Sequence, residues 1–107
     1  GFFFSHYYLV GVDLTNTNLR EADLSHANLE GVCLRGANLH GAEIYGANLT
    51  GANLTGANLT AVKRNRDTRF TYACYDDNTI WPEDFDVEKS GAIFGREFSK
   101  LGKNTQN

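Results

Sequence analysis

The chain has 107 residues, a formal net charge of −3 and no methionine. This length suits one small domain, which buries only about 60–70% of its unfolded surface. The acidic balance argues against a nucleic-acid-binding protein, which carries a basic patch or stripe. No stretch approaches the roughly 20 apolar residues of a membrane helix, and no signal peptide is visible. We therefore expect a cytoplasmic protein. The missing initiator methionine indicates an incomplete N-terminus. Either a tag was removed or the sequence is a piece of a longer protein.

Residues 2–61 repeat with a period of five, in twelve units without a slip. The middle residue of each unit, here called the centre, is large and apolar. The residue two positions earlier is mostly alanine, the residue between them is mostly Asp or Asn, and the last residue is glycine in seven units. The centres are Phe4, Leu9, Leu14, Leu19, Leu24, Leu29, Leu34, Leu39, Ile44, Leu49, Leu54 and Leu59.

A period of five fits neither an α-helix, which needs about 3.6 residues per turn, nor a strand, which needs 2. It fits a chain that turns a corner every five residues, with glycine easing a positive φ at the corner. Four sides close a square, so the pattern predicts an all-β solenoid of about three coils, stacked about 4.8 Å apart. Leucine and alanine interdigitate inside, and we expect all twelve centres to be buried. Phe2 and Tyr7, the largest residues at the alanine position, are expected to plug the open first coil.

These A-(D/N)-L-x-G units resemble the pentapeptide-repeat family, which implies a right-handed quadrilateral β-helix over residues 2–61. Aromatic residues at Phe2, Phe3, Tyr7 and Tyr8 depart from the family pattern. Residues 75–86 and 90–92 resemble the tail of many cyanobacterial members, which implies a cyanobacterial source. Most members have no assigned biochemical role, a few bind DNA gyrase as acidic mimics of DNA, and others are interaction modules.

Residues 62–101 are predicted to form a non-repeat C-terminal cap, because the open end of a repeat array needs an atypical terminal element. Residues 63–67 are polar and are expected to form a loop that leaves the last coil. Residues 86–91 are expected to form one helical turn, capped by Asp86 and stopped by Gly91. Residues 102–107 are expected to be disordered. The aromatic cap is predicted from Phe70, Tyr72, Tyr75, Trp81 and Phe85, with Trp81 mostly buried, and a weak helical spacing is noted at Ile93, Phe94, Phe98 and Leu101.

Stacking at a period of twenty predicts columns of equivalent residues, and stacked amides in a column can hydrogen-bond to one another. The predicted columns are Asn18, Asn38 and Asn58; Tyr8, Asn28 and Asn48; and Asp13, Cys33 and Asn53.

Histidines and acids give no firm site. His6 and His26 stack above Gly46 and lack a third metal ligand in that column. His40 is a lone surface residue, and Asp76 and Asp77 are acids of a solvated loop. Cys33 and Cys74 lie in no C-x-x-C pair and are expected to be free thiols in a reducing compartment. We predict no metal site.

No catalytic or cofactor-binding residue is predicted either, because no Ser-His-Asp set, Gly-rich phosphate loop or paired-carboxylate cleft is found. The sequence thus predicts a non-enzymatic structural or protein-interaction module that needs no cofactor. Its partner would be another protein, another domain of a longer chain, or a second copy bound through an end of the helix, with no direct contact to nucleic acid.

The alternative is an acidic DNA mimic that binds a topoisomerase such as DNA gyrase. That role needs an acidic stripe matching about one phosphate charge per 1.7 Å. Three coils span only roughly 14 Å, and the outer acids are scattered over different columns.

Overall fold

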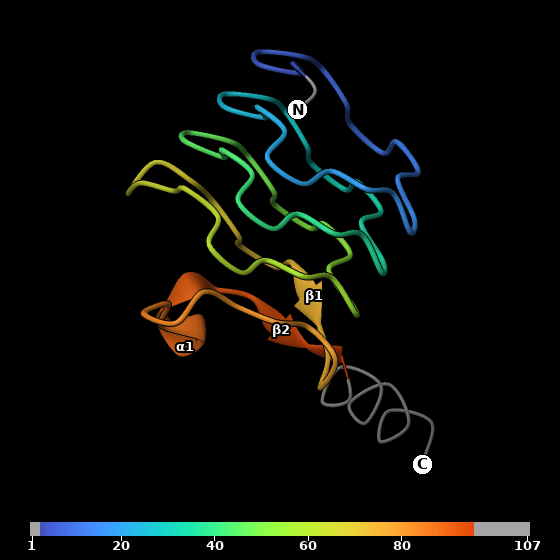
Figure 1. Cartoon of the computed structure of the whole chain (residues 1–107). Helices are drawn as coiled ribbons and strands as arrows, with labels where there is room; N and C mark the ends of the chain where they lie inside the picture. The colour runs from blue at the N-terminus through green and yellow to red at the C-terminus, as the bar shows by residue number, and fades with distance from the viewer. Residues whose placement is uncertain (1–2, 96–107) are drawn as a thin grey trace.

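The computed structural model describes residues 3–95 and consists mainly of short extended pieces joined by tight turns (Figure 1). It contains three regular elements: β1 (Cys74–Tyr75), α1 (Val87–Ser90) and β2 (Ile93–Phe94). Strands β1 and β2 pair in parallel, with Cys74 opposite Ile93 and Tyr75 opposite Phe94. None of the helices in residues 3–95 is long and apolar enough to cross a membrane.

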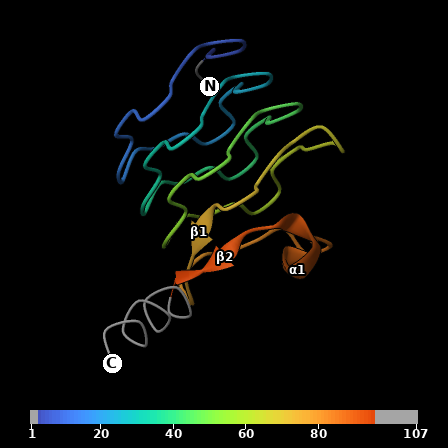
Figure 2. The ribbon, with the colours of Figure 1, turned by 180° about the vertical axis from the view of Figure 1, so that it is seen from behind.

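The rest of the chain is held together by isolated parallel bridges between successive rows. Among the described residues there are twelve such bridges, and nine of them join residues 20 positions apart, such as Phe3 with Asp23. We name the rows rung 1 (residues 3–21), rung 2 (22–41), rung 3 (42–61) and rung 4 (62–81). Figures 1 and 2 show them stacked, with rung 1 at one end and α1, β1 and β2 at the other.

Each corner is a tight turn closed by a backbone hydrogen bond, as from Ala47 N to the Ile44 carbonyl (3.1 Å). The third residue of the turn has a positive φ, +64° at Gly46, as in a type II turn. This confirms the predicted role of glycine. Gly46 has a second reason to lack a side chain, because an added Cβ would lie 2.6 Å from Nδ1 of His26 in the rung above.

The core is a continuous stack of centres and alanines. Every centre from Leu19 to Leu59 is buried, including Leu24, Leu34 and Leu54 at 0% exposure. The prediction that all twelve centres are buried is wrong for Phe4, Leu9 and Leu14, which are only partly buried. These three belong to rung 1, and no described row lies above them.

The ladder continues beyond Ala61, where the sequence predicts that the repeat ends. Lys63 bridges Glu43, and rung 4 then pairs with rung 3 on three further sides. The predicted loop at residues 63–67 is therefore wrong at its start, because Lys63 lies within the ladder and only the following corner leaves it. The later bridges are Asn48 with Arg69, Asn53 with Cys74 and Asn58 with Ile80, at separations of 21, 21 and 22 residues.

The wider separations arise from two corners of rung 4 that each hold one extra residue, at 65–68 and 76–79. Oδ1 of Asn65 accepts hydrogen bonds from Gly46 N (3.0 Å) and Asp67 N (3.2 Å). Oγ1 of Thr68 donates to the Ile44 carbonyl (2.7 Å). The extra residue is thus accommodated while backbone groups of rung 3 stay satisfied.

The second enlarged corner repeats these bonds. Oδ1 of Asp76 accepts from Gly56 N (2.9 Å) and Asn78 N (3.0 Å). Oγ1 of Thr79 donates to the Leu54 carbonyl (2.8 Å). The two segments, Asn-Arg-Asp-Thr and Asp-Asp-Asn-Thr, therefore share one (N/D)-x-x-T corner design.

Aromatic side chains replace leucine in rung 4. Phe70, Tyr75 and Trp81 follow the centres of rung 3, and Phe85 stacks on Trp81 with ring centroids 4.8 Å apart. Trp81 also meets Phe70 and Tyr75 edge-to-face, at 5.4 and 5.6 Å. Trp81 packs against the buried core but stays partly exposed. Tyr72 was predicted in this cluster wrongly, because it occupies a corner at φ +59° and is 67% exposed.

The end of the described chain crosses beneath rung 4. Helix α1 confirms the predicted helical turn, with Asp86 accepting a bond from Lys89 N and Gly91 ending it in a left-handed conformation. The helical spacing noted at Ile93 and Phe94 is wrong, since both lie in β2 and pair with β1. Phe98, Leu101 and residues 102–107 lie outside the described residues.

Candidate interaction surfaces

The three predicted columns are confirmed by the bridges between their members. The Asn and Asp side chains of these columns, however, accept hydrogen bonds within their own turns. Oδ1 of Asn58 accepts from Thr60 N (3.0 Å) and Thr60 Oγ1 (2.7 Å), and Asn38 caps His40 N in the same way. Within residues 3–95 we find no amide-to-amide bond along these columns. The columns are therefore structural, with the amides serving as turn caps.

Two histidine predictions have different outcomes. The rings of His6 and His26 stack as expected, with centroids 4.9 Å apart and planes inclined by 23°. No group of three or more His, Cys, Asp or Glu side chains gathers in the described residues to hold a metal ion. His40 is not a lone surface residue, because its Nδ1 lies 2.6 Å from Oγ1 of Thr60 in the next rung. It ties rung 2 to rung 3.

Asp76 is part of an enlarged corner, which corrects its assignment to a solvated loop. Partial burial disfavours its charged form, but the hydrogen bonds from Gly56 N, Asn78 N and Thr79 outweigh burial and lower the pKa of the carboxyl. The pKa of Asp13 is also lowered, by hydrogen bonds from the Thr15 hydroxyl and backbone N–H. Both carboxylates therefore fix backbone turns, which gives them a structural role.

The two cysteines share one outer column. Both are free and partly buried, and each bridges the same residue, Asn53, from opposite sides. Burial, and then the negative charge of Asp76, raises the pKa of the Cys74 thiol. A raised pKa reduces the thiolate fraction, which makes Cys74 a poor nucleophile.

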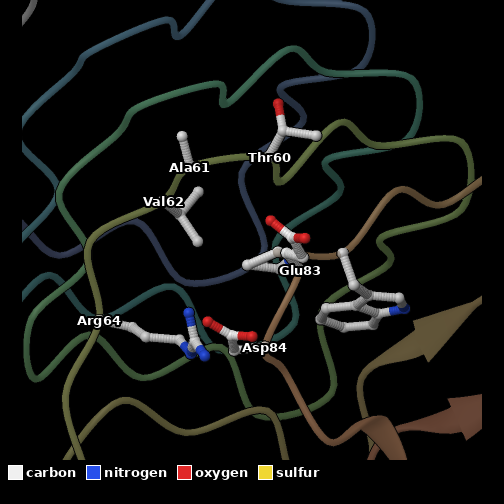
Figure 3. A pocket seen from close by; sticks show the side chains of 8 residues that line it. Thr60, Ala61, Val62, Arg64, Glu83 and Asp84 are labelled. Atoms are coloured by element: carbon white, nitrogen blue, oxygen red, sulfur yellow. The ribbon is translucent and has the colours of Figure 1, made fainter.

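A hollow of about 460 Å³ lies between the corner at Ala61 and the segment that follows Trp81. Figure 3 shows Arg64, Glu83 and Asp84 around it. The Arg64 guanidinium lies 5.0 Å from the centre of the Phe85 ring, which holds it in place by a cation–π contact. The hollow is open to solvent and mixes both signs of charge. This arrangement suits weak polar contacts and provides no nucleophile with an adjacent base.

Rung 1 carries most of the exposed large apolar side chains. Eight such residues occur in the described chain, and five of them lie between residues 3 and 12. Phe3 is 81% exposed, Tyr8 75% and Tyr7 54%. The predicted plug is wrong for Tyr7, which contacts Phe4 edge-to-face at 5.8 Å but lies largely in solvent. Phe2 lies outside the described residues. The outward direction follows from position, because Phe3 and Tyr8 occupy the bridge position between the inward-facing residues.

On its upper side, rung 1 pairs with no row of the described residues. In rung 2, the N–H groups of Asn28, Cys33 and Asn38 donate upward to rung 1 at 2.8–2.9 Å. The equivalent residues of rung 1 are Tyr8, Asp13 and Asn18. Neither the backbone N–H nor the carbonyl of these three bonds to any described residue. The sequence shows the aromatic departure of this rung, but it did not predict that Phe3 and Tyr8 face solvent.

Comparison with known protein families identifies the repeat. The family model of pentapeptide repeats matches residues 4–36 and 22–61 with eight copies of the repeat. The chain belongs to the pentapeptide-repeat family, whose members are right-handed β-helices. A search of curated proteins finds no significant match.

Solved structures of this family include similar proteins from cyanobacteria. A pentapeptide repeat protein from Nostoc PCC 7120 (alr5209) is 33% identical, with 86% of this chain and 84% of that chain covered and a TM-score of 0.48. Rfr23 from Cyanothece 51142 is 37% identical, with coverage of 74% and 60% and a TM-score of 0.47. HetL from Nostoc PCC 7120, involved in heterocyst differentiation regulation, is 32% identical, with coverage of 73% and 42% and a TM-score of 0.34.

Proposed function

We propose that this chain is a non-enzymatic protein-interaction module, built as a right-handed quadrilateral β-helix of four coils that correspond to rungs 1–4. Phe70, Tyr75, Trp81 and Phe85, with β2 beneath them, act as the cap of one end. The exposed outer side chains of rung 1 form the interaction surface. Proteins of this family are generally not enzymes, and the filled core from Leu19 to Leu59 supports the same role, since it leaves no room for a substrate.

The observation that carries the proposal is the contrast between the aromatic residues of rung 1 and those of rung 4. The aromatic rings of rung 4 contact one another and the core, whereas Phe3 and Tyr8 of rung 1 face solvent. Several large exposed apolar side chains gathered within one rung are characteristic of surfaces that bind another polypeptide. The proposal does not extend to DNA mimicry, because the outer acids of residues 3–95 do not form a stripe. The column of Asp23 and Glu43, for example, ends at Lys63, whose Nζ lies 3.9 Å from the Glu43 carboxylate.

Site-specific photo-crosslinking tests the proposal. A photoreactive phenylalanine analogue replaces Tyr8 in one variant and Tyr72, another exposed tyrosine, in the matched control. The variants are expressed in a cyanobacterial host, irradiated and analysed by mass spectrometry. We expect a defined crosslinked polypeptide from position 8 and little product from position 72. No product at position 8, or equal and diffuse products at both positions, would contradict an interaction role for rung 1.

A further inference from the structure

We propose that the exposed aromatic side chains of rung 1, together with carboxylates just below them in rungs 2 and 3, bind an arginine-bearing segment of a partner protein. This inference rests on the interaction role proposed above and names the chemistry of the partner. The surface, here called the acidic–aromatic surface, consists of Phe3, Tyr8, Asp23, Glu30 and Glu43. These side chains point sideways from the solenoid, so a further coil above rung 1 would leave their outer sides accessible.

Charge is distributed unevenly around the solenoid. The first two sides of rungs 1–3 hold no Lys or Arg and three acids, which are Asp23, Glu30 and Glu43 (residues 3–11, 22–31 and 42–51). The other two sides hold two bases and two acids (residues 12–21, 32–41 and 52–61). Three acids without a base give a formal charge of −3, whereas the charges of the other two sides sum to zero. The first two sides therefore attract a cationic partner.

The carboxylates of this surface are available to a partner. Oδ1 of Asp23 accepts a hydrogen bond from Ser25 N (3.0 Å), and within residues 3–95 neither Asp23 nor Glu30 forms an ion pair. Glu43 reaches Lys63 only at 3.9 Å, with both side chains largely in solvent, so this pair contributes little to stability. A cation from a partner can therefore approach each carboxylate without displacing a strong internal contact.

Exposed rings lie directly above these carboxylates. Phe3 bridges Asp23, so its ring is one row, about 4.8 Å, above that carboxylate. On the next side Tyr8 bridges Asn28, and Glu30 follows two residues later in the same row. A guanidinium can stack on an aromatic ring and donate to a neighbouring carboxylate at once, because it is planar and weakly hydrated. A lysine ammonium is a compact, strongly hydrated charge, so this surface favours arginine over lysine.

Rung 4 sets the lower limit of the acidic–aromatic surface. On the same two sides its charge is reversed, because residues 63–69 hold four bases and one acid. A basic segment is repelled there and is directed to rungs 1–3. Tyr72, the exposed tyrosine of rung 4, follows this basic segment and therefore serves as the matched control for Tyr8.

Fluorescence anisotropy tests the inference on the full chain, with a labelled peptide in which arginine alternates with glycine and serine. Low ionic strength is used, because exposed charges are then least screened. We expect saturable binding, about two- to fivefold tighter than for the same peptide with lysine in place of arginine.

Two aspartates provide a matched pair of variants. Asp23→Asn removes the charge and keeps the turn cap, since Oδ1 of Asn28 accepts from Glu30 N (3.2 Å) at the same position of its unit. This variant should bind the arginine peptide about two- to fivefold more weakly. Asp13 caps Thr15 N in the same way (3.0 Å) on a side outside the acidic–aromatic surface. Asp13→Asn should therefore leave the affinity unchanged.

Two tyrosines provide a second pair. Tyr8→Leu keeps an apolar side chain but removes the aromatic face, so it should reduce the advantage of the arginine peptide over the lysine peptide. Tyr72→Leu should leave that advantage unchanged. Circular dichroism and thermal denaturation of each variant show whether it is folded.

The outcomes separate the two proposals. Equal binding of the arginine and lysine peptides, equal losses from Asp23→Asn and Asp13→Asn, or no saturable binding would overturn the inference. If the arginine peptide does not bind while position 8 crosslinks a defined protein, the partner chemistry is wrong and the interaction role stands. If position 8 gives no product of any kind, the interaction role fails, and the inference that rests on it fails as well.

Discussion

Rung 1 and rung 4 are both rich in aromatic residues, yet they use them in opposite ways. In rung 4, Phe70, Tyr75 and Trp81 sit at centres, point inward and contact one another. In rung 1, Phe3 and Tyr8 sit at bridge positions and point outward. Position within the unit therefore decides whether an aromatic side chain contributes to the core or to the surface. The two rungs are thus chemically different, because the aromatic rings of rung 4 pack on one another and those of rung 1 face solvent.

The comparison also separates what the ladder needs from what the repeat motif supplies. Rungs 2 and 3 follow the A-(D/N)-L-x-G pattern closely, whereas rung 4 keeps little of it beyond Ala73. Rung 4 nevertheless pairs on all four sides. The ladder depends on bridge residues in extended conformation and on corners that satisfy the backbone of the preceding rung. Asn65 and Asp76 supply these corners through hydrogen bonds, where rungs 2 and 3 rely mainly on glycine.

Removing rung 4 should have the largest effect on stability and solubility. A chain that stops after Ala61 loses the acceptors of Ile44 N, Leu49 N, Leu54 N and Leu59 N and exposes the lower side of rung 3. We expect this fragment to aggregate or to unfold at a much lower temperature, as measured by size-exclusion chromatography and thermal denaturation. A fragment that stops after Gly95 keeps rung 4 and should behave like the full chain. A soluble shorter fragment of equal thermal stability would show that rungs 1–3 need no closure.

The next largest difference should be between the stability losses caused by a cavity in rung 2 and by a cavity in rung 1. Leu34 is fully buried in rung 2 between Leu14 and Leu54, and Leu34→Ala should lower the free energy of unfolding by about 2–5 kcal/mol. Leu14→Ala, on the same side of the partly exposed rung 1, should cost only about 1–2 kcal/mol, since part of that surface already meets water. Urea denaturation of the two variants measures the difference. Equal losses would mean that Leu14 is covered as fully as Leu34 in solution.

The sequence predicted the repeated part of the fold well. The five-residue period gave the corners, the inward leucines and the columns, because each depends on spacing alone. The half-buried state of Phe4, Leu9 and Leu14 did not follow from spacing, since it reflects the lack of a described row above them. Tyr72 was wrongly assigned to the aromatic cluster because the register shifts within rung 4, which places this residue at an exposed corner.

Rung 4 itself was missed because its spacing widens to six residues at two corners. A signal was nevertheless present, since Asn65-Arg66-Asp67-Thr68 and Asp76-Asp77-Asn78-Thr79 share the (N/D)-x-x-T pattern eleven residues apart. Physically, the Asn or Asp closes the turn and the Thr reaches back to a carbonyl of the rung above.

Two glycine corners of rung 3 should show a smaller difference in stability. Gly46→Ala and Gly51→Ala both place a side chain at a φ near +65°, which costs about 1–2 kcal/mol for an L-residue. Gly51 has open space around its missing Cβ, whereas Gly46 faces His26. We expect Gly46→Ala to be the more destabilising of the two by urea denaturation, and to displace His26 from its stack on His6, as seen in the NMR shifts of both rings. Equal stabilities with unchanged ring shifts would show that His26 does not fill this corner.

The smallest expected effect compares the two enlarged corners of rung 4, which are alike except that one uses an amide and the other a carboxylate. Hydrogen bonds lower the pKa of Asp76, so its contribution to stability is fully present above the ordinary aspartate range and is lost as the pH falls below about 4. Asp76→Asn keeps the acceptor that Asn65 uses and should change the free energy of unfolding by no more than about 0.5 kcal/mol at pH 7, because the site is largely solvated. The two stability curves should converge as the pH falls from 5 to about 3. Asn65→Asp, the matched exchange at the other corner, should introduce the same acid-dependent loss. Parallel curves for the parent chain and Asp76→Asn over this range would show that the Asp76 charge plays no part in holding its corner, and that the (N/D)-x-x-T design depends on the acceptor oxygen alone.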